Sequence, residues 1–294
     1  MQNFDKFVGI DWSGAKAPIN SKSIAVASLS KNKDNLKLHS EIRSRNAVAD
    51  YIHSLAMGNK RTLIGIDCNF GYADEIVKKH IGPNGTAYDL WAHVDLVNQE
   101  HSNFFAGNFW QHKNYKDDFW IEGKMQAGFK MPQRATEIIC AKNGYGNPES
   151  PFKLIGAKQV GKGGLAGMRM VHYLKNILGN KIAIWPFDNT QICNQARVVI
   201  TEIYPRQFIM RTGKGVRKIR QLIDLKEILN LFHVKQEKIP NFTDHDSDAL
   251  VSAAGLRYLC GMENDVSLNV SKPFEMPEKA KLTEGWIFGV GDMT

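Results

Sequence analysis

Phe7-Val8-Gly9-Ile10-Asp11 is an apolar run of strand length that ends at a carboxylate. A second run of the same kind, Leu63-Ile64-Gly65-Ile66, ends at Asp67. Short apolar runs are typical of buried strands. A carboxylate beside such a run is costly unless it lies exposed at the strand end, pairs with a cation or binds a metal. The two runs therefore predict two core strands that each carry an aspartate at one end.

Further strand and helix patterns surround these two runs. We expect strands at 24–27, 36–42, 182–185, 198–204 and 286–288, and helices at 46–55, 168–178, 216–232 and 249–259. Short turns join the three early strands, which favours an antiparallel meander, whereas helices separate the later strands, which favours parallel additions. The sequence therefore predicts the α/β class, with a mixed sheet of five strands or more flanked by helices.

The segment after the fourth predicted strand differs from the rest of the chain. Residues 81–150 are rich in Asn, Gly, His and aromatic side chains and show no clean period. We expect residues 81–160 to form a long, partly irregular inserted subdomain. The length of 294 residues permits one elaborated domain, so we expect residues 1–294 to fold as a single unit.

The composition is that of a globular protein with a basic balance. Hydrophobic residues make up 43% and charged residues 23%, which argues against a disordered or fibrous chain. The formal charge of +8 favours polyanionic partners such as nucleic acid. The sequence has neither the apolar run of about 18 residues that a membrane helix needs nor a secretory signal. Its four cysteines form no CxxC pair, so we expect a cytoplasmic protein with no membrane partner and no thiolate zinc site.

Four acidic residues lie at or inside the predicted elements: Asp11 and Asp67 at strand ends, Glu202 within a strand, and Asp248 at a helix start. Any one of them alone is more often a turn or capping residue. Strand ends and a helix start at one edge of a sheet can bring such residues together, and a divalent cation removes their mutual repulsion. Oxygen ligands favour Mg²⁺ or Mn²⁺. Two such ions can activate water and stabilise the leaving oxygen in phosphodiester hydrolysis.

Two more polar residues precede the last of these acids. Asp244 and His245 lie four and three residues before Asp248, so on a helix all three share one face. We predict that His245 is a metal ligand or a proton shuttle and that Asp244 is a further metal ligand. The alternative for His245 is a polar residue at a helix start that faces water.

Four short motifs occur in a fixed order along the chain. They are Gly9-Ile10-Asp11-Trp12-Ser13-Gly14-Ala15, Gly65-Ile66-Asp67-Cys68-Asn69-Phe70-Gly71, Glu202-Ile203-Tyr204-Pro205 and His245-Asp246-Ser247-Asp248-Ala249-Leu250. Together they resemble domain-of-unknown-function family 429, a group regarded as predicted nucleases with an RNase H-like fold. The resemblance runs from residue 7 to about residue 259 and includes the stretches 159–168 and 185–187.

The resemblance implies roles for the acidic residues. Asp11 resembles the first-strand aspartate of RNase H-like nucleases, and Asp248 resembles the acid on their last helix. Asp67 or Glu202 would supply the middle acid. His245 to Asp248 also resembles RuvC-like nucleases, in which a His or Asp precedes the helix acid by three residues. The long insertion and the two candidates for the middle acid depart from plain RNase H, so the identity of the middle ligand stays open.

Basic residues near the motifs are candidates for substrate binding. They are Lys158, Lys162, Arg169, Arg211, Lys214, Arg217 and Lys218. Such side chains can contact a nucleic-acid backbone without reading its sequence, although a solvated surface is at least as common a role. The stretch 156–162 matches the opening of a P-loop, but Gly163 stands where Ser or Thr would hold Mg²⁺. We therefore interpret that match as coincidental.

The leading prediction is metal-dependent phosphodiester hydrolysis of nucleic acid by an RNase H-like fold. The first alternative is an ATP-binding phosphotransferase of the actin–sugar kinase type, whose first phosphate loop the stretch 9–14 resembles. That group normally has two copies of the fold, whereas this sequence shows one. The second alternative is a non-catalytic nucleic-acid-binding module on the same scaffold. The sequence does not distinguish DNA from RNA and predicts no oligomeric state.

Overall fold

The computed structural model describes residues 4–16, 23–125, 128–156, 160–215, 218–235, 239, 241–261 and 276–291. Its centre is a six-stranded sheet in the order β3-β2-β1-β4-β6-β5. The strands are β1 (Lys6–Asp11), β2 (Ala25–Ser30), β3 (Lys33–Leu38), β4 (Thr62–Ile66), β5 (Ile182–Ile184) and β6 (Val198–Glu202). Neighbours among β1, β2 and β3 are antiparallel, whereas β1, β4, β6 and β5 are parallel. The predicted mixed α/β sheet is confirmed.

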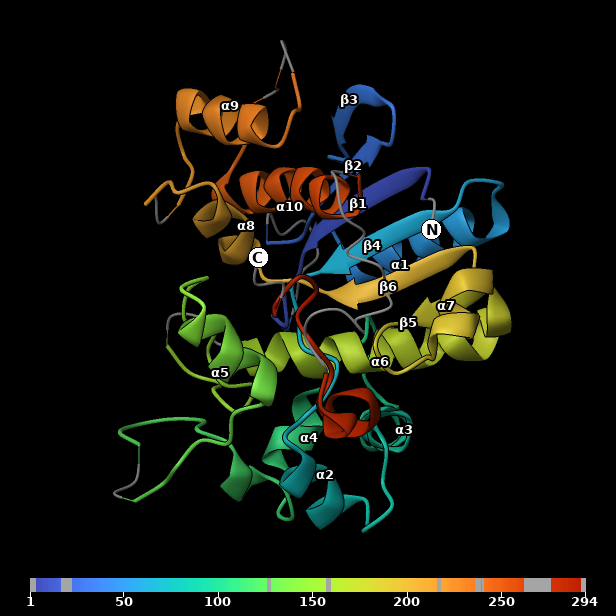
Figure 1. Ribbon diagram of the computed structural model, residues 1–294. Coiled ribbons are helices and arrows are strands. Elements are labelled where there is room, and N and C mark those ends of the chain that lie inside the picture. Colours follow the sequence, from blue (N-terminus) through green and yellow to red (C-terminus); the bar gives the residue numbers. More distant parts are fainter. Residues whose placement is uncertain are drawn as a thin grey trace.

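Helices cover both faces of this sheet. They are α1 (Arg45–Met57), α2 (Asp74–His80), α3 (Ala87–Val97), α4 (Gly107–Gln111), α5 (Ala135–Lys142), α6 (Val160–Leu178), α7 (Thr190–Gln195), α8 (Pro205–Arg211), α9 (Leu222–Leu231) and α10 (Asp244–Gly261), with short turns η1 (Lys116–Asp118), η2 (Gly179–Lys181) and η3 (Ala280–Glu284). Figure 1 shows α10 across one face and α6 on the other, with α2, α3 and α4 beyond α6 and α5 beside one end of it. None of the helices in the described ranges is long and apolar enough to span a membrane.

Several of the predicted element bounds are wrong. The helix expected at 168–178 begins at Val160, and the strand expected at 36–42 is β3 and ends at Leu38. The strand expected at 286–288 is a single bridge between Ile287 and Glu202, because the chain turns away directly afterwards. The helix expected at 216–232 begins at Leu222, and residues 216 and 217 lie outside the described part of the chain. The helix expected at 249–259 begins five residues earlier, at Asp244, where Thr243 caps it. This earlier start brings the motif from 245 to 248 onto the helix.

The alternation of β1 directs its side chains to two separate cores. Val8 and Ile10 pack in the cluster that includes α6, whereas Phe7 packs in the cluster that includes α10. Gly9 lies on the α10 side, where an added Cβ would come 2.4 Å from the carbonyl oxygen of Ala249. Gly65 of β4 likewise leaves room for Leu256 of α10. The two glycines therefore let α10 lie directly on the strand backbones, which fixes the position of its first turn.

Residues 81–160 contain α3, α4, η1 and α5, joined by long irregular stretches. The large aromatic side chains of this segment, among them Trp91, Phe109 and Phe119, are buried in the same apolar cluster as the sheet residues Val8 and Ile64. These parts of the segment therefore pack on the α6 side of the sheet, whereas Cys140 of α5 is buried in the cluster that includes α10.

Candidate active site

Three acidic residues meet at one edge of the sheet because β1, β4 and β6 are parallel neighbours in register. Ile10 pairs with Ile66, and Ile66 pairs with Glu202. Asp11 and Asp67 each follow the paired isoleucine of their strand, and the Asp67 N–H donates to the carbonyl of Ile10 across 2.9 Å. The carboxyl ends of three adjacent strands therefore bring Asp11, Asp67 and Glu202 to one edge of the sheet. Asp11 and Asp67 project from the α10 face, whereas Glu202, level with Ile66, projects from the opposite face.

The first two turns of α10 add two polar side chains to this edge. His245 Nδ1 lies 2.6 Å from Asp11 Oδ2, so the ring is held against the strand end. Asp248 lies one helical turn further on, on the same side of α10 as His245. The side chain of His245 is 42% exposed, whereas that of Asp11 is 9% exposed, so the histidine lies at the mouth of the site and the aspartate lies beneath it.

A capping box sets where α10 begins. The Thr243 N–H donates to Asp246 Oδ2 across 2.9 Å, and the Asp246 N–H donates back to Thr243 Oγ1 across 3.2 Å. Arg43 also pairs with Asp246 Oδ1 at 2.9 Å. These contacts engage both carboxylate oxygens of Asp246 and stabilise the start of the helix. They thereby fix the direction in which His245 and Asp248 project.

We call Asp11, Asp67 and Asp248 the carboxylate cluster. Burial, followed by repulsion from Asp11, Asp248 and Glu202, raises the pKa of Asp67 well above its usual value. Burial and then repulsion from Asp11 raise the pKa of Asp248 to about 7. Burial also raises the pKa of Asp11, although its hydrogen bond with His245 opposes the shift. The three carboxyl groups therefore lie close enough for their charges to interact.

The charge on His245 responds to the same neighbours. Its hydrogen bond to Asp11 is the largest cause of a raised pKa, and attraction to Asp11, Asp244 and Asp248 adds to the shift. The imidazolium is thus a counter-charge to the cluster. Asp244 itself pairs with Lys218 at 2.5 Å at the rim of the site.

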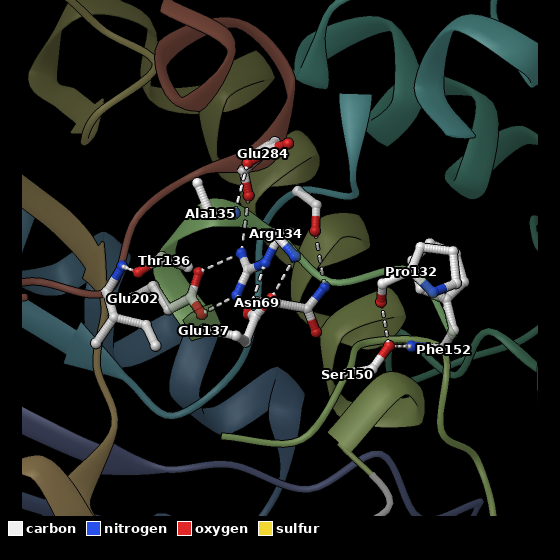
Figure 2. A network of polar contacts seen from close by, with 12 residues as sticks. Asn69, Pro132, Arg134, Ala135, Thr136, Glu137, Ser150, Phe152, Glu202 and Glu284 are labelled. Carbon is white, nitrogen blue, oxygen red and sulfur yellow. Dashed lines mark hydrogen bonds and ion pairs between the residues drawn. The ribbon is translucent and has the colours of Figure 1, made fainter. Parts of the chain in front are cut away.

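Glu202 has a partner that the sequence analysis missed. Arg134, just before α5, donates from Nη1 to Glu202 Oε2 at 2.8 Å and from Nη2 to Glu202 Oε1 at 2.5 Å (Figure 2). The same guanidinium bonds Glu137 through Nε at 2.8 Å and the carbonyl of Glu284 through Nη1 at 2.8 Å. Arg134 is 1% exposed, so this network is dry. No pattern in the sequence marks Arg134, which lies in an irregular stretch.

The Arg134 network also ties the end of the chain to the site. Glu284 Oε2 accepts from the Ala135 N–H at 2.9 Å, and the Phe288 N–H donates to the carbonyl of Glu202 at 2.9 Å. Burial raises the pKa of Glu137 to about 7 against the opposing pull of Arg134. Residues 134–137 and the segment 284–288 thus converge around Glu202 at the end of β6.

The basic candidates for substrate binding are dispersed. Lys218 lies at the rim of the site through its pair with Asp244. Lys162, in the first turn of α6, lies over the ring of Trp110 at 5.8 Å. Lys214 pairs with Glu227 on the surface, at 2.6 Å. Lys158 and Arg217 are outside the described residues.

Two of the basic candidates, Arg169 and Arg211, make contacts within the protein. Arg169 is 6% exposed and bonds Asp95 at 2.8 Å and the carbonyl of His101 at 3.0 Å. Arg211 is half-buried over the ring of Tyr145, at 4.3 Å. Their positions give no support to the expected substrate contacts, because charge in a sequence does not reveal a distant partner within the fold.

Within the described ranges, no group of three or more His, Cys, Asp or Glu side chains has the ready-made geometry of a metal site. Comparisons with protein-family models, with curated proteins and with solved structures each returned no match.

Proposed function

We propose that the chain is a metal-dependent nuclease that hydrolyses phosphodiester bonds of nucleic acid on an RNase H-like scaffold. The observation that carries the proposal is the carboxylate cluster, in which the buried Asp11 and the half-buried Asp67 and Asp248 gather at one sheet edge with raised pKa values. Buried carboxylates that repel one another are unfavourable without a cation. A divalent ion that binds between these carboxylates would remove the repulsion and so stabilise the folded chain.

The donor chemistry of the cluster fits Mg²⁺ or Mn²⁺. All of its atoms are carboxylate oxygens, which these hard cations prefer, and no sulfur ligand competes, because the nearby thiol of Cys68 is buried with a strongly raised pKa. Asp11, Asp67 and Asp248 would hold the ion. Such ions supply an activated water and stabilisation of the leaving oxygen when they are bound.

The remaining residues of the site have roles that follow from their positions. His245 is bonded to Asp11 and half-exposed, so it can pass a proton between the site and solvent. Lys218 lies at the rim, where a cation can meet a phosphate oxygen. The order of elements supports the RNase H-like assignment, since one acid ends the first strand and another opens the last long helix.

The test is cleavage of end-labelled DNA and RNA, each single-stranded, double-stranded and branched, with Mn²⁺, with Mg²⁺ and with EDTA. We expect Mn²⁺-dependent cleavage that falls at least a hundredfold in Asp11→Asn and in Asp248→Asn. Asp50→Asn is the matched control, because Asp50 lies exposed on α1. Binding of ATP without cleavage would instead favour the phosphotransferase, and binding of nucleic acid with neither would favour the non-catalytic module.

A further inference from the structure

The sequence leaves two candidates for the middle acid, and the surroundings of these two residues differ. Both oxygens of Glu202 accept hydrogen bonds from Arg134 (Figure 2). The charges that act on Asp67 among the described residues are those of Asp11, Asp248 and Glu202, and all three raise its pKa. Glu202 pairs with Ile66, the residue before Asp67, so the side chains of Glu202 and Asp67 leave opposite faces of the sheet and belong to different charge environments.

The pairing of Glu202 with Arg134 opposes metal binding in two ways. Two parallel hydrogen bonds use one lone pair on each oxygen, in the bidentate geometry that arginine favours. A divalent ion on the remaining lone pairs would also lie close to the guanidinium charge, and like charges repel strongly at short range in a dry interior. Glu202 is 5% exposed and Arg134 is 1% exposed, so water screens this repulsion little.

Two residues besides Glu202 hold Arg134 in place. Glu137 accepts from its Nε at 2.8 Å, and the carbonyl of Glu284 accepts from its Nη1 at 2.8 Å. The Arg134 N–H also donates to Glu137 Oε2 at 2.7 Å. The guanidinium is therefore fixed before any metal arrives, and it fixes Glu202 in turn.

We propose that Arg134 is a positioning residue that holds Glu202 outside the coordination shell and leaves Asp67 as the middle metal ligand. This inference rests on the proposed function, because it concerns the same metal. Glu202 then acts at a distance, adding negative charge beside Asp67, while Asp11, Asp67 and Asp248 bind the ion directly.

The test is Mn²⁺ binding to the full chain, measured by calorimetry and by the electron paramagnetic resonance signal of free Mn²⁺. We expect Glu202→Gln to change the Kd less than about threefold and Asp67→Asn to raise it at least tenfold. Equal losses in the two variants would overturn the inference and leave the nuclease proposal standing. A wild-type chain that binds no Mn²⁺ would overturn both, whereas Mn²⁺ binding of the expected pattern without any cleavage would overturn only the nuclease proposal.

Variants of Arg134 separate positioning from mere folding. Arg134→Gln frees the Glu202 carboxylate, so we expect Mn²⁺ to bind more tightly or with a higher stoichiometry. The double variant Arg134→Gln/Glu202→Gln should lose that gain, and Arg134→Lys should restore wild-type binding because it keeps the positive charge. An Arg134→Gln chain that folds and binds Mn²⁺ as the wild type does would overturn the inference. If that variant does not fold, the comparison of Glu202→Gln with Asp67→Asn decides alone.

Discussion

His245 Nδ1 and Asp11 Oδ2 lie 2.6 Å apart and join the first turn of α10 to the last residue of β1. The contact spans 234 positions in the sequence. It places a protonatable ring against the carboxyl group of Asp11. The negative charges of neighbouring acids disfavour the ionised form of that group. Protons and a divalent cation therefore compete for the same charge at this site, and this competition can be measured.

Mn²⁺ binding should strengthen as pH rises through neutrality. The pKa of Asp248 is about 7, and those of Asp11 and Asp67 are raised as well, so below neutrality these ligands hold protons that the metal must displace. For a single group of that pKa, the ionised fraction grows about tenfold between pH 6 and pH 8. We expect the Kd for Mn²⁺ to fall by at least that factor in calorimetric titrations. A pH-independent Kd would contradict this assignment.

The metal-free protein should lose stability over the same pH range. Asp11, Asp67 and Asp248 have raised pKa values in the folded state, so the folded chain retains protons that the unfolded chain has already released. The stability that they contribute is greatest at acid pH and is lost as pH rises through their folded pKa values. His245 acts in the same direction, because its pKa is also raised. Melting temperatures in EDTA should therefore fall from pH 5 to pH 8, and saturating Mn²⁺ should reverse the fall.

Asp248→Asn should stabilise the metal-free protein while abolishing cleavage. A carboxyl pKa displaced from 3.8 to about 7 corresponds to an upper limit of about 4 kcal/mol of unfavourable charge. With partial exposure reducing this effect, we expect a gain of about 1–2 kcal/mol in the free energy of unfolding at pH 8. Denaturant titration in EDTA measures it. The combination of gained stability and lost activity distinguishes a functional carboxylate from a structural one.

Asp246→Asn is the matched control for that variant. Asp246 lies two residues away on the same helix, but its carboxylate completes the cap with Thr243 and pairs with Arg43. We expect this change to cost about 1 kcal/mol of stability, as the loss of a helix cap does. If Asp248→Asn destabilised the metal-free chain as Asp246→Asn does, the mutual repulsion within the cluster would be refuted.

The positions of Asp11 and Asp67 at the ends of two strands could be predicted because each depends only on the residues next to it in the sequence. An apolar run that ends at Asp11, and another that ends at Asp67, specify two buried strands with a carboxylate at the same end of each. Parallel pairing then brings the two ends together. The capping of α10 is equally local, since Thr243 and Asp246 have the spacing of a capping box.

The partners of the charged residues were beyond prediction because they come from distant parts of the chain. Arg134 lies 68 positions before Glu202, in a stretch without periodicity. Arg169 meets Asp95 from 74 positions away. The sequence does not distinguish a basic residue that forms an ion pair inside the fold from one that contacts a substrate. The structure is needed to tell the two roles apart.

Gly9→Ala should disturb the site through the packing of α10 on β1. A Cβ at Gly9 would lie 2.4 Å from the Ala249 carbonyl oxygen and 2.6 Å from the Ala253 N, so α10 must move off the strand. We expect a loss of about 1–3 kcal/mol, as overpacking of a core produces, together with weaker Mn²⁺ binding because Asp248 moves with the helix. Gly261→Ala is the control within the same helix, since a Cβ there meets nothing within 4 Å. If Gly9→Ala lowered stability yet kept the wild-type Kd for Mn²⁺, the position of α10 would not govern the metal site, and Asp248 would be excluded as a ligand.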